Sequence, residues 1–154
     1  MNKVIATELP LQSLLSDRVK PTDFIDCYSV RSELSPRDAA EIITHFPGWA
    51  RFLLKIRAVI TTPLGLSNEG PPAPDKVGVF PVESESSHEL IVGFNDKHLD
   101  FRVSVLSQEG RVFLATWVHT NNIGGDWYLK AILPFHILIS RNALARVRTA
   151  GNVL

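Results

Sequence analysis

The sequence predicts an α+β domain in which a long C-terminal helix packs across an antiparallel sheet. Two patterns predict this class: apolar and polar residues alternate from Val77 to about Asn121, and apolar residues recur at helical spacing from about Gly125 to Arg148. A length of 154 residues with 45% hydrophobic content is sufficient for one domain with its own core. We therefore expect a single domain over residues 1–154, with its core at about residues 23–148.

Charge, cysteine content and the N-terminus argue against several classes of protein. Sixteen basic and sixteen acidic residues give a net charge of zero, so no nucleic-acid partner is expected. Cys27 is the only cysteine, which excludes a disulfide framework. Glu8 and Pro10 interrupt what would be the apolar part of a signal peptide, and no run reaches the roughly 18 apolar residues of a membrane span. We expect a cytoplasmic protein that does not span a membrane.

The first two elements are a strand and a short helix. "DFIDCYSVRS" is rich in aromatic and β-branched residues and predicts a strand in which Phe24, Asp26 and Tyr28 share one face. In "LSPRDAAEII", Ser35 is suited to cap a helix whose first residue is Pro36. We expect this helix to end near "HFPG".

A second, amphipathic helix follows, and it is expected to pack on the core rather than to form a cofactor or partner surface. Its polar side carries Arg51 and Lys55. The segment from Pro63 to Lys76 has too many prolines and glycines for a packed element, and we expect a connector there rather than a lid. The apolar residues of the helix recur at spacings of three and four: Trp49, Phe52, Leu53, Ile56, Val59 and Ile60.

Four strand-like runs then predict an antiparallel meander: "VGVFPVES", "HELIVGF", "HLDFRVSVL" and "RVFLATWVH". The connections "ESS", "NDK" and "SQEG" are short enough for hairpins. The first strand is expected at an edge of this sheet, which gives five strands and a small cavity. One face is predicted to be core and the other wet, with Leu99, Phe101, Val103 and Val105 on the core face and His98, Asp100, Arg102 and Ser104 on the wet face.

The stretch from Trp127 to Val147 is expected to be a helix roughly 30 Å long that lies along the sheet. Pro134 should bend it, because proline lacks the N–H for a helical hydrogen bond. His136 falls at the border of the apolar face, where a half-buried histidine bonded to the sheet is favoured over a pocket acid or base. Helical winding puts Lys130, Arg141 and Arg148 on one line and Tyr128, Ile132, Phe135 and Ile139 around the opposite pole.

This order of elements is that of the helix-grip fold of START-like, Bet v 1-like and polyketide-cyclase-like proteins (SRPBCC). Over roughly Asp23 to Arg146 the sequence closely resembles DUF2867, a bacterial family of unknown function grouped with that superfamily. The most specific parts are the "DKHLDFR" hairpin and the "N..G..Y.....PFH" helix. The resemblance implies an intracellular helix-grip domain without an assigned reaction. Asn121 stands where the family often has a histidine, which weakens a catalytic reading of that position.

Several candidate chemical sites have ordinary structural explanations. His98, Asp100 and His119 could supply metal ligands, but a solvated charge ladder across paired strands is favoured. Cys27 has no neighbours in sequence that would activate it as a nucleophile. Arg57 could bind a ligand carboxylate, although pairing with a structural carboxylate is favoured. We expect no metal and no cofactor.

The architecture predicts that a small apolar or amphipathic molecule binds between the long helix and the sheet. The alternatives are an enzyme acting on such a ligand, with His136 or the pair His98 and Asp100 as acid and base, and an interaction domain whose groove is filled. A homodimer is a further option. A cavity of at least about 300 Å³ under the helix would favour binding or catalysis. The predicted ligand-binding residues are Tyr128, Ile132, Phe135, His136, Leu99, Phe101, Val103 and Arg57.

Overall fold

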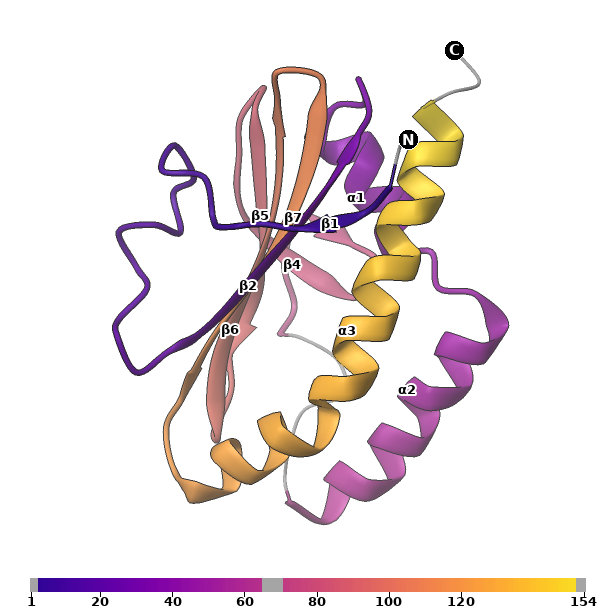
Figure 1. Ribbon diagram of the computed structural model, residues 1–154. Helices are drawn as coiled ribbons and strands as arrows, with labels where there is room; N and C mark the ends of the chain where they lie inside the picture. The colour runs from indigo at the N-terminus through magenta and orange to yellow at the C-terminus, as the bar shows by residue number, and fades with distance from the viewer. Residues whose placement is uncertain (1–2, 65–70, 152–154) are drawn as a thin grey trace.

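The computed structural model describes residues 3–64 and 71–151 and shows a seven-stranded antiparallel sheet with its helices on one side (Figure 1). The long helix α3 packs across the sheet, as predicted. The helices are α1 (Pro36–Thr44), α2 (Gly48–Thr61), the 3-10 turn η1 (Thr62–Leu64) and α3 (Ile123–Gly151). The strands are β1 (Ile5–Ala6), β2 (Phe24–Arg31), β3 (Lys76–Val77), β4 (Phe80–Glu85), β5 (Glu89–Asn95), β6 (Leu99–Gln108) and β7 (Arg111–Thr120).

The sheet has the order β1-β2-β7-β6-β5-β4-β3, so the predicted meander runs from β4 to β7. The first predicted strand, β2, joins the meander beside β7, with Phe24 opposite Val118. It is not at the edge, because β1 pairs with its other side through Ile5 and Ser29. The prediction of five strands missed β1 and β3, which are only two residues long and carry no readable alternation.

Helix α1 begins and ends where its local signals predict. The Ser35 hydroxyl accepts a hydrogen bond from the Asp38 N–H at 3.2 Å, and Pro36 occupies the first turn. The helix stops at Thr44, directly before "HFPG". Its buried residues Ala39 and Ile43 join the main core, where small and branched side chains fill the space between α1, α3 and the sheet.

The face of the sheet opposite the helices is not fully exposed to solvent. The chain before β2 crosses it, on the far side from the helices (Figure 1), and buries Leu15 against Cys27, Ile91 and Trp117. The wet-face prediction is therefore wrong for the middle of the sheet, because about 20 N-terminal residues without clear periodicity supply a second apolar layer.

A buried carboxylate fastens this N-terminal segment. Glu89 is 4% exposed and accepts hydrogen bonds from the Ser13 hydroxyl at 2.6 Å, the Leu14 N–H at 2.9 Å and the Ser104 hydroxyl at 2.5 Å. Three donors on one buried carboxylate replace the water that it would otherwise bind. Glu89 thus joins the N-terminal segment to strands β5 and β6.

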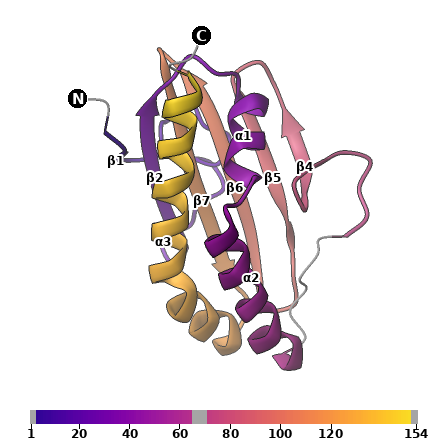
Figure 2. The same ribbon diagram turned by 90° about the vertical axis from the view of Figure 1, so that its right-hand side faces the viewer.

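The apolar side of α2 departs from the sequence prediction. Four of its residues, which we call the α2 stripe, are between 41% and 75% exposed rather than packed in the core. Figures 1 and 2 show α2 on the helix side of the sheet, beside the N-terminal half of α3 and farther from the strands. Ala50 is buried on another side of the same helix. The α2 stripe consists of Trp49, Phe52, Ile56 and Val59.

Helix α3 is longer than predicted and runs from Ile123 to Gly151. It continues through Pro134, and Figure 1 shows it changing direction in its N-terminal half, as the missing N–H leads one to expect. Among the described residues, no helix combines the length and hydropathy needed to cross a lipid bilayer.

Candidate functional site

The sheet face under the helices is covered unevenly. At one end, below α1 and the C-terminal half of α3, Val30, Leu90 and Val112 are completely buried. At the other end, under the N-terminal half of α3 (Figure 2), burial on the same face is mixed: Leu99, Val118 and Thr116 are 7–8% exposed, whereas the remaining side chains are half-buried. We call these half-buried side chains the distal face; they are Phe24, Asp26, Phe94, Phe101 and Val103.

An aspartate and a histidine meet at the distal face. His136 Nε2 lies 3.0 Å from Asp26 Oδ2, and the two side chains are 22% and 18% exposed. The Phe24 ring stands edge-on to the imidazole, with 6.1 Å between ring centroids. The other oxygen, Asp26 Oδ1, is buried and accepts no hydrogen bond from any described residue. A buried carboxylate oxygen without a donor is uncommon, because burial removes its water.

The contact between Asp26 and His136 corrects the predicted orientation of α3. The sequence predicts Phe135 at the apolar pole and His136 at its border, but Phe135 is 49% exposed and His136 faces Asp26. The buried residues of the helix, such as Ser140 and Val147, lie on the same side as His136. Helix α3 is thus rotated about its own axis relative to the prediction. The side that packs on β2 is not the side on which its apolar residues are most concentrated.

The other predicted ligand-binding residues have varied surroundings. Tyr128 and Ile132 of α3 are half-buried, and Leu99 is 7% exposed. The Phe101 ring packs edge-to-face on Phe94 and Phe80, with centroids 4.9 and 5.9 Å away. Val103 packs against the main core. The side chain of Arg57 lies outside the described part of the chain.

The residues of the "DKHLDFR" and "N..G" motifs fix the start of α3 on the sheet. The Asn122 side-chain oxygen accepts from the Gly125 N–H at 3.0 Å, which caps the helix, and lies 3.0 Å from His98 Nδ1. Gly125 is buried so close to the His98 carbonyl that any Cβ would clash with it. Asn121 donates to Asp100 Oδ1 at 3.2 Å. These contacts give the motif a structural role and occupy both His98 and Asp100.

His119 pairs with a residue that the sequence reasoning did not consider. Its Nδ1 lies 2.6 Å from Asp23 Oδ1, and the Trp117 Nε1–H donates to Asp23 Oδ2 at 2.8 Å. Burial would raise the pKa of Asp23, but hydrogen bonds from His119, the Lys20 N–H and Trp117 outweigh it and hold that pKa below its usual 3.8. In the part of the chain that the structure describes, no three potential metal-ligating side chains converge.

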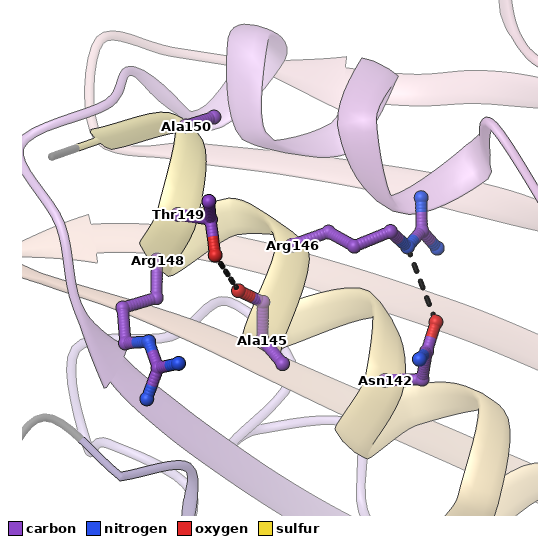
Figure 3. Close-up of a pocket in the computed structure, with 6 residues that line it drawn as sticks. All are labelled: Asn142, Ala145, Arg146, Arg148, Thr149 and Ala150. Carbon is purple, nitrogen blue, oxygen red and sulfur yellow. Dashed lines mark hydrogen bonds between the residues drawn. The ribbon is translucent and has the colours of Figure 1, made fainter. Parts of the chain in front are cut away.

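Two surface hollows lie away from the distal face. One, of about 420 Å³, is formed by the last turns of α3 (Figure 3). The other, of about 330 Å³, is lined by residues 32–35, 87–88 and 107–111. None of the predicted ligand-binding residues whose side chains the structure describes lines either hollow. The residues around the first are Asn142, Ala145, Arg146, Arg148, Thr149 and Ala150.

Arg146 is a structural residue although it borders the first hollow. Figure 3 shows its guanidinium reaching away from α3; Nη1 donates to the carbonyls of Ile42 at 2.6 Å and His45 at 2.7 Å, at the end of α1. Its Nε donates to Asn142 at 3.2 Å. A cation at the C-terminal end of a helix satisfies unpaired carbonyls and opposes the negative end of the helix dipole. Burial lowers the pKa of Arg146, since burial disfavours the charged form.

The sequence contained a signal for the pair that it missed. Asp26 alternates with Phe24, Tyr28 and Val30 on one face of β2, and the largely apolar character of that face marks it as a buried surface where an unpaired carboxylate is costly. Its partner could have been sought among the histidines and arginines of the helix that covers this face. The expected hydrogen bond between a half-buried His136 and the sheet is confirmed, but its partner, Asp26, is 110 positions away in the sequence, and no local pattern identifies it.

Comparison with known proteins places the chain in a family. The family model described as "Protein of unknown function (DUF2867)" matches residues 18–143. No curated protein and no solved structure matches the chain. The matched range includes all of strands β2 to β7 and helices α1 and α2, most of α3, and both Asp26 and His136. The chain therefore belongs to the DUF2867 family.

Proposed function

We propose that the protein is a START-like binding domain that holds a small apolar or amphipathic molecule between the distal face, α2 and the N-terminal half of α3. The observation that supports this most directly is the uneven cover of the sheet. Phe24, Phe94, Phe101 and Val103 are half-buried, whereas the same face is completely buried at its other end. A ligand with an apolar body would remove these side chains from water.

The side of α3 that borders this region can be derived from Arg146, which points at α1. Tyr128 lies about five helical turns before Arg146 and therefore on the same side of α3. Ile132 and Phe135 lie within about 40° of that line, given 100° per residue. They therefore face the side on which α1 and α2 lie, and the exposed α2 stripe offers apolar contacts from the neighbouring helix.

Binding of the uncharged dye Nile red, combined with thermal unfolding, tests the binding function. Ile132→Trp should abolish binding with little loss of stability if the region accepts a ligand, because the larger side chain occupies the ligand's place. If side chains already fill the region, the same change should cost about 1–3 kcal/mol through overpacking. Leu138→Trp is the matched control, since Leu138 is 55% exposed on another side of α3 and should leave binding unchanged.

Stability loss in Ile132→Trp, together with no binding by the unmutated protein, would refute the proposal. Native mass spectrometry of protein purified from its own host gives an independent result, because a copurifying small molecule would identify the ligand class.

Catalysis on the same ligand is the second candidate, and the pair of Asp26 and His136 is the observation that favours it. A carboxylate that orients an imidazole is a common arrangement for acid–base catalysis. His98 and Asp100 are weaker candidates, since Asn122 and Asn121 contact them. Conversion of a bound molecule that is lost in His136→Gln while binding persists would establish the enzyme.

A further inference from the structure

We propose that the bound molecule carries a hydrogen-bond donor, a hydroxyl or a protonated amine, and that Asp26 Oδ1 accepts from it. This inference rests on the proposed function and specifies the head group of the ligand. His136 acts as a positioning residue, because it holds the other carboxylate oxygen at 3.0 Å. The apolar part of the molecule would then extend over the distal face.

The carboxylate is held firmly enough to select a head group. Asp26 is the third residue of β2 and is paired with Thr116 of β7, within a ladder that runs from Phe24 to Arg31. Its side chain projects to the helix side, where His136 and the edge of Phe24 restrict it. A receptor group that is fixed in advance loses little conformational entropy when a ligand binds.

The charge at this position favours donors and disfavours acids. The only ion-pair partner of Asp26 among the described residues is His136, and the nearby Arg141 lies over the Tyr28 ring instead, 5.5 Å from its centroid. A fatty acid would bring a second carboxylate towards an acceptor, whereas a hydroxyl or ammonium group would supply the hydrogen bond that Oδ1 lacks.

The test compares four probes that share a twelve-carbon chain and differ in the head group. Each probe is tested for displacement of Nile red from the protein: dodecylamine, dodecan-1-ol, 1-methoxydodecane and dodecanoic acid. We expect the amine and the alcohol to bind about tenfold or more tightly than the methyl ether, the range for a hydrogen bond to a charged group, with the acid weakest. Tighter binding of the amine than of the alcohol at neutral pH would identify a cationic head group. Equal affinities of the two would identify a hydroxyl.

Asp26→Asn provides the decisive variant, because it keeps the shape of the side chain and removes its charge. The amide would turn its oxygen to His136 and its NH₂ to the ligand, so the donor preference should vanish or invert. Asp23→Asn is the matched control, since Asp23 bonds Trp117 and His119 and should leave the ranking of the probes unchanged. Thermal unfolding of both variants confirms that they are folded.

The possible results separate the inference from the function on which it rests. Probes that bind with equal affinity whatever their head group, or a ranking that persists in Asp26→Asn, would overturn the donor inference and leave ligand binding in place. A protein that binds neither Nile red nor any probe would remove the proposed function, and the inference with it.

Discussion

Replacing Arg146 tests how α1 is attached to α3. The variant Arg146→Met keeps the apolar stem of the side chain in place and removes the guanidinium. The carbonyls of Ile42 and His45, which accept from Nη1 at 2.6 and 2.7 Å, then lose their charged donor at the end of α1. The carbonyl of Ile43, 3.4 Å from Nη2, loses a weaker one.

The size of the effect follows from these bonds. Hydrogen bonds to a charged group contribute about 1.5–3 kcal/mol each. The two short bonds would therefore contribute about 3–6 kcal/mol to the free energy of unfolding. The loss should be smaller than this for two reasons. Water can replace the donor at His45, which is exposed, and the variant no longer pays the desolvation cost of a buried charge. We therefore expect a loss of about 2–3 kcal/mol, equivalent to about 4–12 °C in the melting temperature of a domain of this size.

Thermal and urea unfolding followed by circular dichroism measure this loss. The control is Lys130→Met, which removes a cation from an exposed position of the same helix and should change stability by less than about 0.5 kcal/mol. If Arg146→Met proved as stable as Lys130→Met, the capping role derived for Arg146 would be wrong.

Four further predictions concern other parts of the fold. Glu89→Ala should release the N-terminal segment from the sheet and lower the free energy of unfolding by about 2–3 kcal/mol. Trypsin should then cleave faster before β2, and an unchanged cleavage rate would contradict the role of Glu89 in holding this segment. The pKa of Asp23 is lowered, so its carboxylate stabilises the fold above the unfolded-state pKa of about 3.8, and this contribution is lost as the pH falls through the lower pKa of the folded protein. The difference in unfolding free energy between the protein and Asp23→Asn should therefore shrink only as the pH falls below about 3.8, and a constant difference would contradict this prediction. Gly125→Ala should lower stability by about 1–3 kcal/mol through a clash with a backbone carbonyl, whereas Gly48→Ala, whose Cβ meets nothing within 4 Å, should not. Burial, aided by a nearby carboxylate, raises the pKa of Cys27 to about 12, so iodoacetamide should label this thiol only after unfolding; labelling of the folded protein would show that the site opens.

The parts of the fold that could be predicted depend on short-range signals. Ser35 and Pro36 define the start of α1 through bonds to residues at most a turn away, and the alternation in β6 depends only on the pleat of its own strand. The chain direction and the neighbours of the meander then follow from short hairpins. These signals do not require knowledge of the tertiary structure.

The parts that could not be predicted depend on distant partners. The amphipathic pattern of α2 is genuine, but it does not reveal what covers the stripe, and Phe52 is 62% exposed in the chain alone. The second apolar layer depends on Leu15 meeting Trp117, and the rotation of α3 on His136 meeting Asp26. Both contacts join residues from opposite ends of the chain, and sequence periodicity does not identify such partners.

The pairing of β2 with β7 has a consequence for the order in which the chain can fold. Phe24 pairs with Val118 and Arg31 with Arg111, so β2 has no partner on that side until nearly the whole sheet has been made. At typical rates of synthesis this delay lasts on the order of 10 s, during which an aromatic and β-branched strand is exposed. Contacts so distant in sequence also slow refolding, because a large loop must close before they form. During synthesis, β2 therefore waits longer for this partner than any strand of the β4–β7 meander waits for its neighbour.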